Sequence, residues 1–574
     1  MTRQSLGPFA LLLALFPLAC GGSAPAPATR SAATPAAEAP LPAIDGNAVL
    51  QHIKVLASDE YQGRFPGTKG EDLSVAYIQQ QFQDLGLAPG NTDGTYIQHV
   101  PLVGITPDPS ASLVFRKGSH VDRLKFKDDF VASTRRVKPT VSLDNSSLVF
   151  VGYGVQAPEY HWDDYKGMDV KGKTLVMLVG DPPVPDPNDP AKLDPKMFGG
   201  PAMTYYGRWT YKYEIGAKLG AAGVIIVHET GPAGYPFSVL QSSTGEAFTL
   251  ETPDGNMNRA AIESWITRDQ AVKLFKMAGK DFDALKAAAV KPDFKPVPLG
   301  VTASITLHNT IRRIQSRNVI AKLEGSDPAL KDEYVIYTAH WDHLGIGPAV
   351  NGDDIYNGAV DNASGVAGLI ELARAFKQLP TPPKRSILFM AVTAEEQGLL
   401  GSEYYATHPI YPLAKTLADI NMDAMNVWGK TKDLTIVGLG NSQLDDYARR
   451  AAAAQGRVLR PDPTPEKGFY YRSDHFNFAK VGVPALDPDS GVDYVGKPDG
   501  YGTKVHDDYI AHDYHQPSDQ VKPDWDMSGE AQDLELLMRV GYDVAQASSY
   551  PQWTPGTEFA AIRAAQLKAA GISR

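Results

Sequence analysis

Six acidic and histidine residues suited to metal-assisted hydrolysis occur in order along one segment of the chain. They are His340, Asp361, Glu395, Glu396, Asp423 and His515. Hydrolysis with metal ions needs nitrogen and carboxylate ligands, a group that bridges two ions, a position open to water, and one unligated carboxylate as general base. Five of the six residues can hold two zinc ions, and Glu395 can move the proton. The set therefore fills every role of a two-metal hydrolase.

The placement of these residues supports this interpretation more than their identity does. His340, Glu395, Glu396 and Asp423 each fall at or just after the end of an expected strand. Open α/β sheets present their ligand sites at the carboxyl ends of strands. We therefore expect the four side chains to converge in space.

The strands and helices around them predict the fold class. Strands are expected at residues 318–323, 334–339, 386–392 and 417–422, and a helix with an apolar face at 366–376. Buried-type strands that alternate with amphipathic helices indicate a mostly parallel, mixed α/β sheet with helices on both faces. Ahead of this region, helical spacing recurs from Ile44 to Leu56 and from Tyr77 to Leu85, and a last helix is expected at 534–544.

A segment with a different sequence pattern precedes this alternation of strands and helices. It contains expected strands at 148–154 and 171–179, a stretch rich in small residues at 215–223, and an apolar run at 224–227. Such an order predicts a strand, a short helix and another strand. The segment resembles a protease-associated domain, β-rich and inserted at residues 146–302, with an exposed proline-rich loop near 182–195.

The N-terminus has the features of an export signal. Arg3 precedes an apolar run at 9–18, which is too short to span a bilayer as a helix. Cys20, the only cysteine, stands where a bacterial lipoprotein signal is cut and lipidated, so residues 1–20 are interpreted as a signal peptide of that type. An ordinary signal peptide cut nearby is the alternative. Either interpretation predicts an exported protein, at the cell envelope or in the periplasm, held to a membrane only by a lipid on Cys20, or else secreted.

The composition of the chain limits the kinds of molecule that it can bind. Residues 21–42 are rich in Ala and Pro and predict a disordered tether, because they cannot bury enough apolar surface to fold. The 574-residue chain has a formal net charge of −11 and no long Lys/Arg run, which argues against nucleic acid as a partner. Its oligomeric state is not specified by the sequence.

Several local motifs resemble those of the M28 family of zinc peptidases. They are His-Trp-Asp at 340–342, Asn-Gly-Ala-Val-Asp-Asn-Ala-Ser-Gly at 357–365, Glu-Glu-Gln-Gly-Leu-Leu-Gly-Ser at 395–402 and Asn-Met-Asp at 421–423. The opening stretch with Gly63-Arg64 and Pro66-Gly67-Thr68 resembles the family as well. The resemblance implies a zinc exopeptidase-like fold, made of the discontinuous segments 43–145 and 303–574.

The resemblance also implies a role for each residue of the site. His340 and Asp423 would hold one of two zinc ions, Glu396 and His515 the other, and Asp361 would bridge them. Asp342 would orient a neighbouring ligand. Glu395 would be the general base for a hydroxide shared by the two ions.

The activity expected from this site is that of an aminopeptidase, which removes the N-terminal residue from peptides. Tyr514 would stabilise the oxyanion, and Arg472 or Asp474 would contact substrate. His343 has no assigned role, and we interpret His506 and His512 as surface histidines.

Three alternatives remain at this point. The first is a carboxypeptidase or dipeptidase on the same scaffold, and the second is a glutaminyl cyclase, disfavoured by the presence of His340. The third is a non-catalytic binding protein, disfavoured because none of the six residues is replaced.

Overall fold

The computed structural model describes residues 41–242 and 244–572. The expected signal peptide, Cys20 and the tether up to residue 40 lie outside the described residues. Within the described part of the chain, no helix has both the length and the apolar character needed to cross a membrane.

A mixed sheet forms the centre of the larger body. In spatial order its strands are β2 (Ile97–Pro107), β13 (Val297–Leu323), β17 (Ser386–Val392), β14 (Tyr334–His340), β18 (Thr416–Asn421), β21 (Ala485–Asp489), β19 (Asp433–Val437) and β20 (Val458–Pro461). The four strands from β17 to β21 are parallel, whereas β13 and β19 are antiparallel to their inner neighbours. Every residue of β14, β17 and β18 is buried, as expected for parallel strands covered on both faces.

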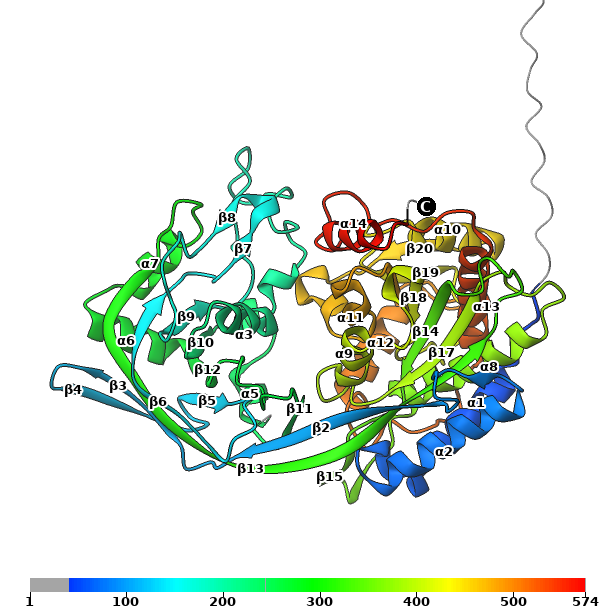
Figure 1. Ribbon diagram of the computed structural model, residues 1–574, viewed down its shortest axis with the longest axis horizontal. Helices are drawn as coiled ribbons and strands as arrows, with labels where there is room; N and C mark the ends of the chain where they lie inside the picture. Colours follow the sequence, from blue (N-terminus) through cyan, green and yellow to red (C-terminus); the bar gives the residue numbers. More distant parts are fainter. Residues whose placement is uncertain (1–40, 243, 573–574) are drawn as a thin grey trace, which may run out of the picture. The chain divides into compact units, whose positions relative to one another are not determined.

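Helices cover both faces of this sheet, which confirms the predicted fold class (Figure 1). One face carries α1 (Gly46–Leu56), α2 (Lys69–Asp84), α8 (Gly365–Lys377) and α13 (Ser528–Gln546), and the other carries α9 (Leu400–Thr407) and α11 (His475–Lys480). Successive side chains of β14 point to opposite faces of the sheet, which explains why helices pack on both faces. Val335 and Tyr337 pack in the core with α8, while Ile336 packs in a separate core with the helices of the second face.

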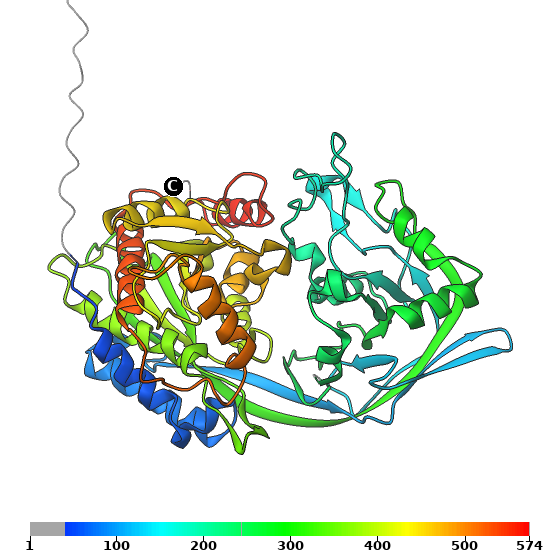
Figure 2. The ribbon, with the colours of Figure 1, turned by 180° about the vertical axis from the view of Figure 1, so that it is seen from behind.

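Three further helices complete this body. They are α10 (Leu444–Ala454), α12 (Tyr501–His512) and α14 (Ala560–Ala569). The helix α12 was not predicted from the sequence; it is shown in orange in Figure 2 and directly precedes the segment that carries His515. Its only buried residue is Gly502, so it lacks the apolar face from which sequence periodicity detects a helix.

A second sheet with its own core forms the rest of the chain. Its strands, in spatial order, are β4 (His120–Lys125), β3 (Ser112–Lys117), the first part of β13, β6 (Thr140–Phe150), β9 (Thr174–Leu178), β10 (Gly223–His228), β12 (Ile262–Thr267) and β5 (Phe130–Ser133). The expected strand–helix–strand unit is present as β9, α3 (Trp209–Lys218) and β10. The core of this sheet draws on residues from Leu113 to Leu307, so it begins earlier in the chain than the expected insertion at 146.

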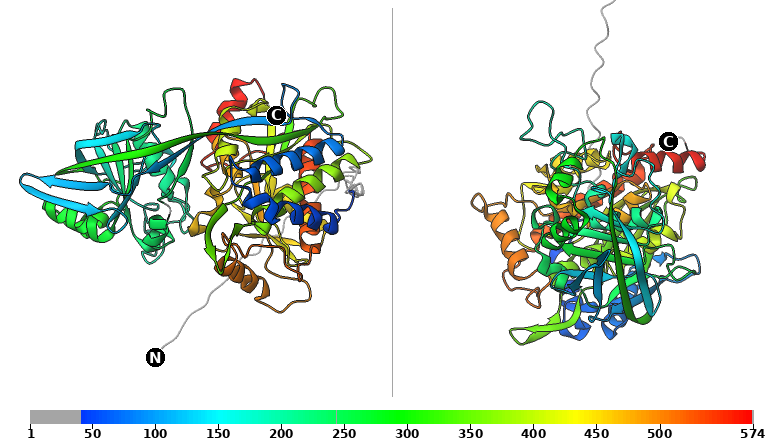
Figure 3. Two further views of the ribbon diagram at one scale, coloured as in Figure 1. Left: turned by 90° about the horizontal axis from the view of Figure 1, so that it is seen from below. Right: turned by 90° about the vertical axis from the view of Figure 1, so that its left-hand side faces the viewer.

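One strand belongs to both sheets. The first half of β13, to His308, pairs with β6 and β3, and the second half, from Asn309, pairs with β2 and then β17. β2 and β13 run side by side, as Figure 1 and the left panel of Figure 3 show. In addition, β11 (Ala247–Leu250) extends from the inserted segment to pair with β2. Backbone hydrogen bonds therefore continue from one sheet to the other.

A buried arginine connects the N-terminal helices to the loops around the candidate site. Arg64 is 1% exposed, and its guanidinium donates to four backbone carbonyl groups. The acceptors are the oxygens of Leu56 at 2.8 Å, Trp341 at 2.8 Å, Asn357 at 2.6 Å and Gly358 at 2.8 Å. Arg64 thus holds the loop after β14 against the loop that leads to Asp361.

We expect Arg64→Met to destabilise the fold strongly. Each buried carbonyl that loses its donor costs about 1–3 kcal/mol, so the loss of four such hydrogen bonds should lower the free energy of unfolding by at least about 4 kcal/mol. Chemical denaturation followed by circular dichroism measures this change.

The matched control is Arg449→Met, which removes an exposed arginine of α10 that pairs with the exposed Asp446. Such a surface pair contributes at most about 1 kcal/mol. Equal destabilisation by the two substitutions would contradict the role assigned to Arg64.

Candidate metal centre

Parallel pairing brings the strand-end residues together. His340 is the last residue of β14, which pairs in parallel with both β17 and β18. Glu395 and Glu396 follow the end of β17, and Asp423 follows the end of β18. The three loops therefore leave the sheet at the same edge, and the structure places these side chains in one cluster.

Asp361 reaches the cluster from the loop before α8, and a second carboxylate fixes that loop. Asp519 is 1% exposed and accepts the backbone N–H groups of Val360 at 3.0 Å and Asp361 at 3.1 Å. His515 comes from the turn after α12 and adopts the left-handed backbone conformation, with φ of 59°. Asp519 had no distinctive motif in the sequence, because its role depends on a contact across 158 residues of chain.

The spacing of the donor atoms fits two tetrahedral ions. His340 Nε2 lies 3.1 Å from Asp423 Oδ1 and 3.3 Å from Asp361 Oδ1. His515 Nε2 lies 3.2 Å from Asp361 Oδ2 and 3.1 Å from Glu396 Oε2. Two atoms bound to one zinc ion at about 2.0–2.1 Å in tetrahedral geometry are about 3.3 Å apart. The two oxygens of Asp361 therefore face two separate donor sets, as a bridging carboxylate requires.

Two other groupings each bring three donor atoms within 4.8 Å of one another: His340 with Glu395 and Asp423, and His343 with Asp361 and Glu396. The distances between the donor atoms in these two groups fit a shared metal ion less well. Glu395 Oε2 is 3.9 Å from His340 Nε2, and His343 Nδ1 is only 2.6 Å from Glu396 Oε1, which is a direct hydrogen bond. We therefore favour the first set of five ligands.

The imidazole of His340 is oriented for a metal. Its Nδ1 lies 3.1 Å from the carbonyl oxygen of Asp342 and donates to it, which leaves the Nε2 lone pair directed at Asp361 and Asp423. A ligating histidine usually donates its second N–H in this way.

Asp342 holds the Glu395-Glu396 loop in place. Its carboxylate is fully buried and accepts the backbone N–H groups of Glu395 at 3.1 Å and Glu396 at 3.4 Å. Burial, together with the charge of Glu396, raises the pKa of Asp342 to about 8, although His340 opposes the shift. Through these two hydrogen bonds Asp342 acts as a positioning residue for the loop that carries the two glutamates.

The two adjacent glutamates have opposite electrostatic environments. Burial works against ionisation of Glu396, but His515 and His343 hold the pKa of Glu396 down to about 2. Burial raises the pKa of Glu395 well above its ordinary value, and the charges of Asp423 and Glu396 add to the rise. One carboxylate thus favours its charged form, as a ligand does, and the other readily accepts a proton, as a general base does.

The ligand Asp423 has supporting partners that sequence reasoning missed. Ser473 Oγ donates to Asp423 Oδ2 at 2.6 Å, and Asn421 Nδ2 donates to Ser473 Oγ at 2.8 Å. Asn421 also donates to Asp487 Oδ1 at 3.1 Å. Ser473 lies between two residues that had been singled out, Arg472 and Asp474, so its segment was identified but its contact was not.

The residues expected to contact substrate have different surroundings. Tyr514 is 43% exposed, and its ring stacks on His515 with 3.9 Å between centroids, so it lies beside the cluster. Arg472 is partly buried and directly precedes Ser473. Asp474, by contrast, is fully buried and accepts from Ser402 Oγ at 2.5 Å. A carboxylate without access to solvent fits a positioning role better than substrate contact.

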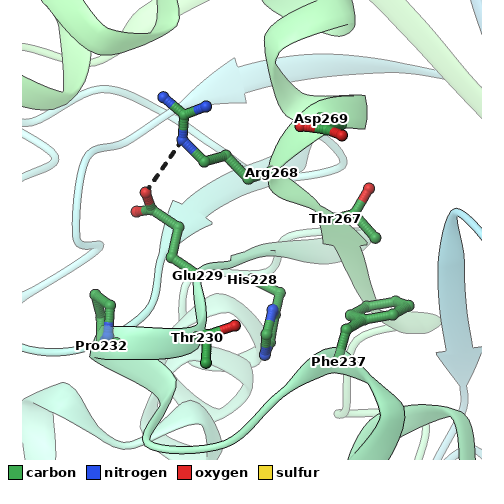
Figure 4. Close-up of a pocket in the computed structure, with 9 residues that line it drawn as sticks. His228, Glu229, Thr230, Pro232, Phe237, Thr267, Arg268 and Asp269 are labelled. Carbon is green, nitrogen blue, oxygen red and sulfur yellow. Dashed lines mark ion pairs between the residues drawn. The ribbon is translucent and has the colours of Figure 1, made fainter.

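A cavity of about 470 Å³ lies elsewhere, in the inserted segment at the ends of β10 and β12 (Figure 4). Glu229 at this cavity pairs with Arg268 at 3.4 Å and with Lys286 at 2.6 Å. His228 contacts the carbonyl oxygen of Tyr235 at 3.0 Å. None of the cavity's lining residues belongs to the metal cluster, and Glu229 and Arg268 in its lining pair with each other, so we assign it no chemistry.

His343 has a structural role that the sequence did not reveal. Its side chain is fully buried and its Nδ1 lies 2.6 Å from Glu396 Oε1. We expect His343→Ala to weaken metal binding about 10- to 100-fold, because loss of a hydrogen bond that orients a ligand costs that much in other metal sites. Competition of the protein with a fluorescent zinc chelator measures the affinity.

His512→Ala is the control, because His512 is exposed on α12 and its Nδ1 contacts only the backbone oxygen of Asp508. Unchanged zinc affinity of the His343→Ala protein, with the fold intact by circular dichroism, would show that His343 does not orient Glu396.

Part of the chain is similar in sequence to known peptidases. Residues 318–538 match the sequence model of Peptidase family M28. The mouse (Mus musculus) protein named Aminopeptidase NAALADL1 is 34% identical over 141 residues, which cover 23% of this chain and 17% of that protein. Aminopeptidase YwaD from Bacillus subtilis is 28% identical over 196 residues, which cover 34% of this chain and 37% of that protein. The matched part is thus well under two thirds of either relative's length.

Among solved structures, an aminopeptidase from Aneurinibacillus sp. strain AM-1 is similar with a TM-score of 0.49 and 21% sequence identity. The similarity covers 88% of this chain and 95% of that one. All six residues of the cluster lie within 318–538, and that segment matches peptidase family M28.

Proposed function

We propose that this protein is a two-zinc aminopeptidase, which hydrolyses the N-terminal residue from peptides. The observation that carries the proposal is the position of Asp361, whose two oxygens lie 3.3 Å from His340 Nε2 and 3.2 Å from His515 Nε2. This is the arrangement expected of one carboxylate shared by two ions. The M28 match over 318–538 and relatives named as aminopeptidases support the same assignment.

The chain's own residues define two binding positions. His340 and Asp423 would hold one zinc ion, Glu396 and His515 the other, and Asp361 both. When bound, the ions would lower the pKa of a water and polarise the carbonyl of the scissile bond. Mixed imidazole and carboxylate donors suit zinc, although cobalt and manganese accept the same donor types.

Glu395 is the proposed general base. Its carboxylate lies 3.9 Å from His340 Nε2 and outside the tighter ligand spacing. Because burial raises the pKa of Glu395, its carboxylate holds a proton readily once it has accepted one. It would take the proton of the attacking water and pass it to the leaving amine, a step typically worth about 10² to 10⁴ in rate.

Metal content and substrate choice test the proposal together. The protein without its first 40 residues should bind two zinc ions per chain and release one amino acid from a peptide with a free N-terminus, and a chelator should abolish the release. N-acetylation of the same peptide should abolish it as well. Equal cleavage of both peptides would exclude an aminopeptidase, and a zinc-loaded protein that cleaves neither would exclude the proposed function.

Glu395→Gln should keep both metal ions and lose nearly all turnover. The amide preserves the size of the side chain but cannot accept the proton, so we expect kcat to fall about 10²- to 10⁴-fold. Single-turnover kinetics and metal analysis on the same sample measure the two quantities.

Asp361→Ala is the contrasting variant, because it removes a ligand and should reduce zinc content itself. Full zinc content of this variant would contradict the bridging role, and turnover of Glu395→Gln within a few-fold of the unsubstituted protein would contradict the base.

Export is also part of the proposal. It rests on the apolar run at 9–18 and on the position of Cys20 after it. Labelling with radioactive palmitate in a bacterial host tests it, since Cys20→Ser should remove the label from a lipoprotein.

A further inference from the structure

The helix α12 buries little surface, although it leads directly into the turn that carries the ligand His515 (Figure 2). The structure describes the whole helix, and Gly502 alone is buried in it. The helix ends at His512, shortly before His515. An element with so few buried contacts opens locally more easily than the core does. The position of His515 therefore depends on the side chain that fixes the C-terminal end of α12.

Tyr509 is the residue of α12 that packs against the core of the larger body, and its side chain is partly buried. Its ring lies 6.1 Å from the ring of Tyr514, which stacks on His515 at 3.9 Å. The carbonyl oxygen of Tyr509 accepts the N–H groups of Asp513 at 2.8 Å and Tyr514 at 2.9 Å. Both the ring and the backbone of Tyr509 thus restrain the turn that contains His515.

The hydroxyl of Tyr509 reaches a second ligand through Asp519. It donates to Asp519 Oδ2 at 3.3 Å. The same buried carboxylate accepts the backbone N–H groups of Val360 and Asp361, as described above. The hydroxyl therefore helps to hold the carboxylate that fixes the loop of Asp361.

Trp428 supports Tyr509 from the larger body. Its ring lies 5.8 Å from the ring of Tyr509 and 5.9 Å from that of His506, and both contacts are edge-to-face. Aromatic pairs favour this geometry. The backbone N–H of Trp428 donates to the buried Asn426 Oδ1 at 3.0 Å, so the tryptophan is itself held in place. Tyr509 thus lies between a fixed part of the body and the turn of His515.

The two proposed metal positions differ in how their ligands are held. What we call the first position uses His340, the last residue of β14, and Asp423, which follows the neighbouring strand β18. The second position uses Glu396 and His515, and Asp361 belongs to both. The contacts of Tyr509 reach two of the three ligands of the second position, but only the shared ligand of the first.

We propose that Tyr509 is a positioning residue for the second metal position: it anchors α12, and through its ring and its hydroxyl it sets the placement of His515 and Asp361. The inference rests on the proposed function, because it requires the two zinc positions. Residues that orient a ligand without touching the ion typically contribute about 10- to 100-fold to metal affinity. Binding of the second ion should therefore depend on α12, and binding of the first should not.

Zinc affinities of single-position variants test this assignment. His340→Ala leaves the second position with all its ligands, and His515→Ala leaves the first. Added to His340→Ala, Tyr509→Ala should weaken zinc binding at least about tenfold, and added to His515→Ala it should weaken binding less than about threefold. Tyr509→Phe keeps the ring beside Tyr514 and should give an intermediate loss at the second position. Competition with a fluorescent zinc chelator measures each affinity.

Tyr501→Ala is the matched control, because it makes the same chemical change at the other end of α12. The Tyr501 ring packs on Tyr494, with 5.3 Å between centroids. Neither zinc affinity should change in this variant. Circular dichroism of each protein shows whether the overall fold is intact.

Hydrogen exchange gives a second readout on the protein that has all its ligands. If anchoring of α12 strengthens zinc binding, zinc must stabilise the anchored helix by the same factor, because coupling between two equilibria is reciprocal. Zinc should therefore slow exchange of the backbone amides at the C-terminal end of α12 by at least about tenfold. Tyr509→Ala should remove most of this protection, whereas Tyr501→Ala should keep it.

Equal weakening of both positions by Tyr509→Ala would overturn the inference, and so would an unchanged affinity of the second. Amides of α12 that exchange at one rate with and without zinc would overturn it as well, even where a single-position variant binds zinc too weakly to measure. If the protein with all its ligands binds no zinc, it is the proposed function that fails.

Discussion

The burial of several carboxylates in contact with one another is the constraint on which the site depends. The side chains of Asp361, Glu396 and Asp342 are all nearly inaccessible to solvent, and Asp423 and Glu395 lie beside them. Like charges at such separations repel strongly in a medium of low dielectric constant. The surrounding protein compensates only in part, through imidazoles and backbone N–H groups. Two divalent cations would supply the charge that the five ligands and Glu395 require.

The loops that carry these side chains have unusual backbone conformations at three positions. Ala394, which precedes Glu395, and Ala424, which follows Asp423, both have φ of 54°. His515 has φ of 59°. Residues other than glycine rarely adopt this left-handed conformation, and where they do the surrounding structure must hold them. Asp342, Asp519 and Ser473 provide that support, so the precision of the metal positions depends on residues that would never touch a metal.

The sequence was sufficient for the strands and for the order of the proposed ligands, because both follow from local rules. Buried strands appear in the sequence as continuous apolar runs. Parallel pairing of β14 with β18 then brings His340 and Asp423 to the same edge of the sheet. What could not be predicted depends on contacts distant in the chain. In the sequence Asp519 looks like any loop aspartate, and only the folded structure shows that it accepts the N–H of Asp361. His343 likewise does not stand out among the histidines of the sequence, and only the structure shows its contact with Glu396. The second core likewise begins at Leu113 because hairpin β3–β4 pairs with the remote strand β13.

The shared strand β13 fixes the inserted segment to the larger body through backbone hydrogen bonds. An insertion joined by flexible linkers alone would move freely against the larger body, whereas backbone pairing that continues from β6 through β13 to β17 limits that freedom. The ion pair of Glu214 with Lys480 and the packing of Tyr205 on Tyr471 add restraints where the inserted segment meets the larger body. Because the candidate ligands all come from the larger body, substitutions in the inserted segment should leave the metal set intact. The two sheets also have separate hydrophobic cores, so a substitution inside one core need not disturb the packing of the other.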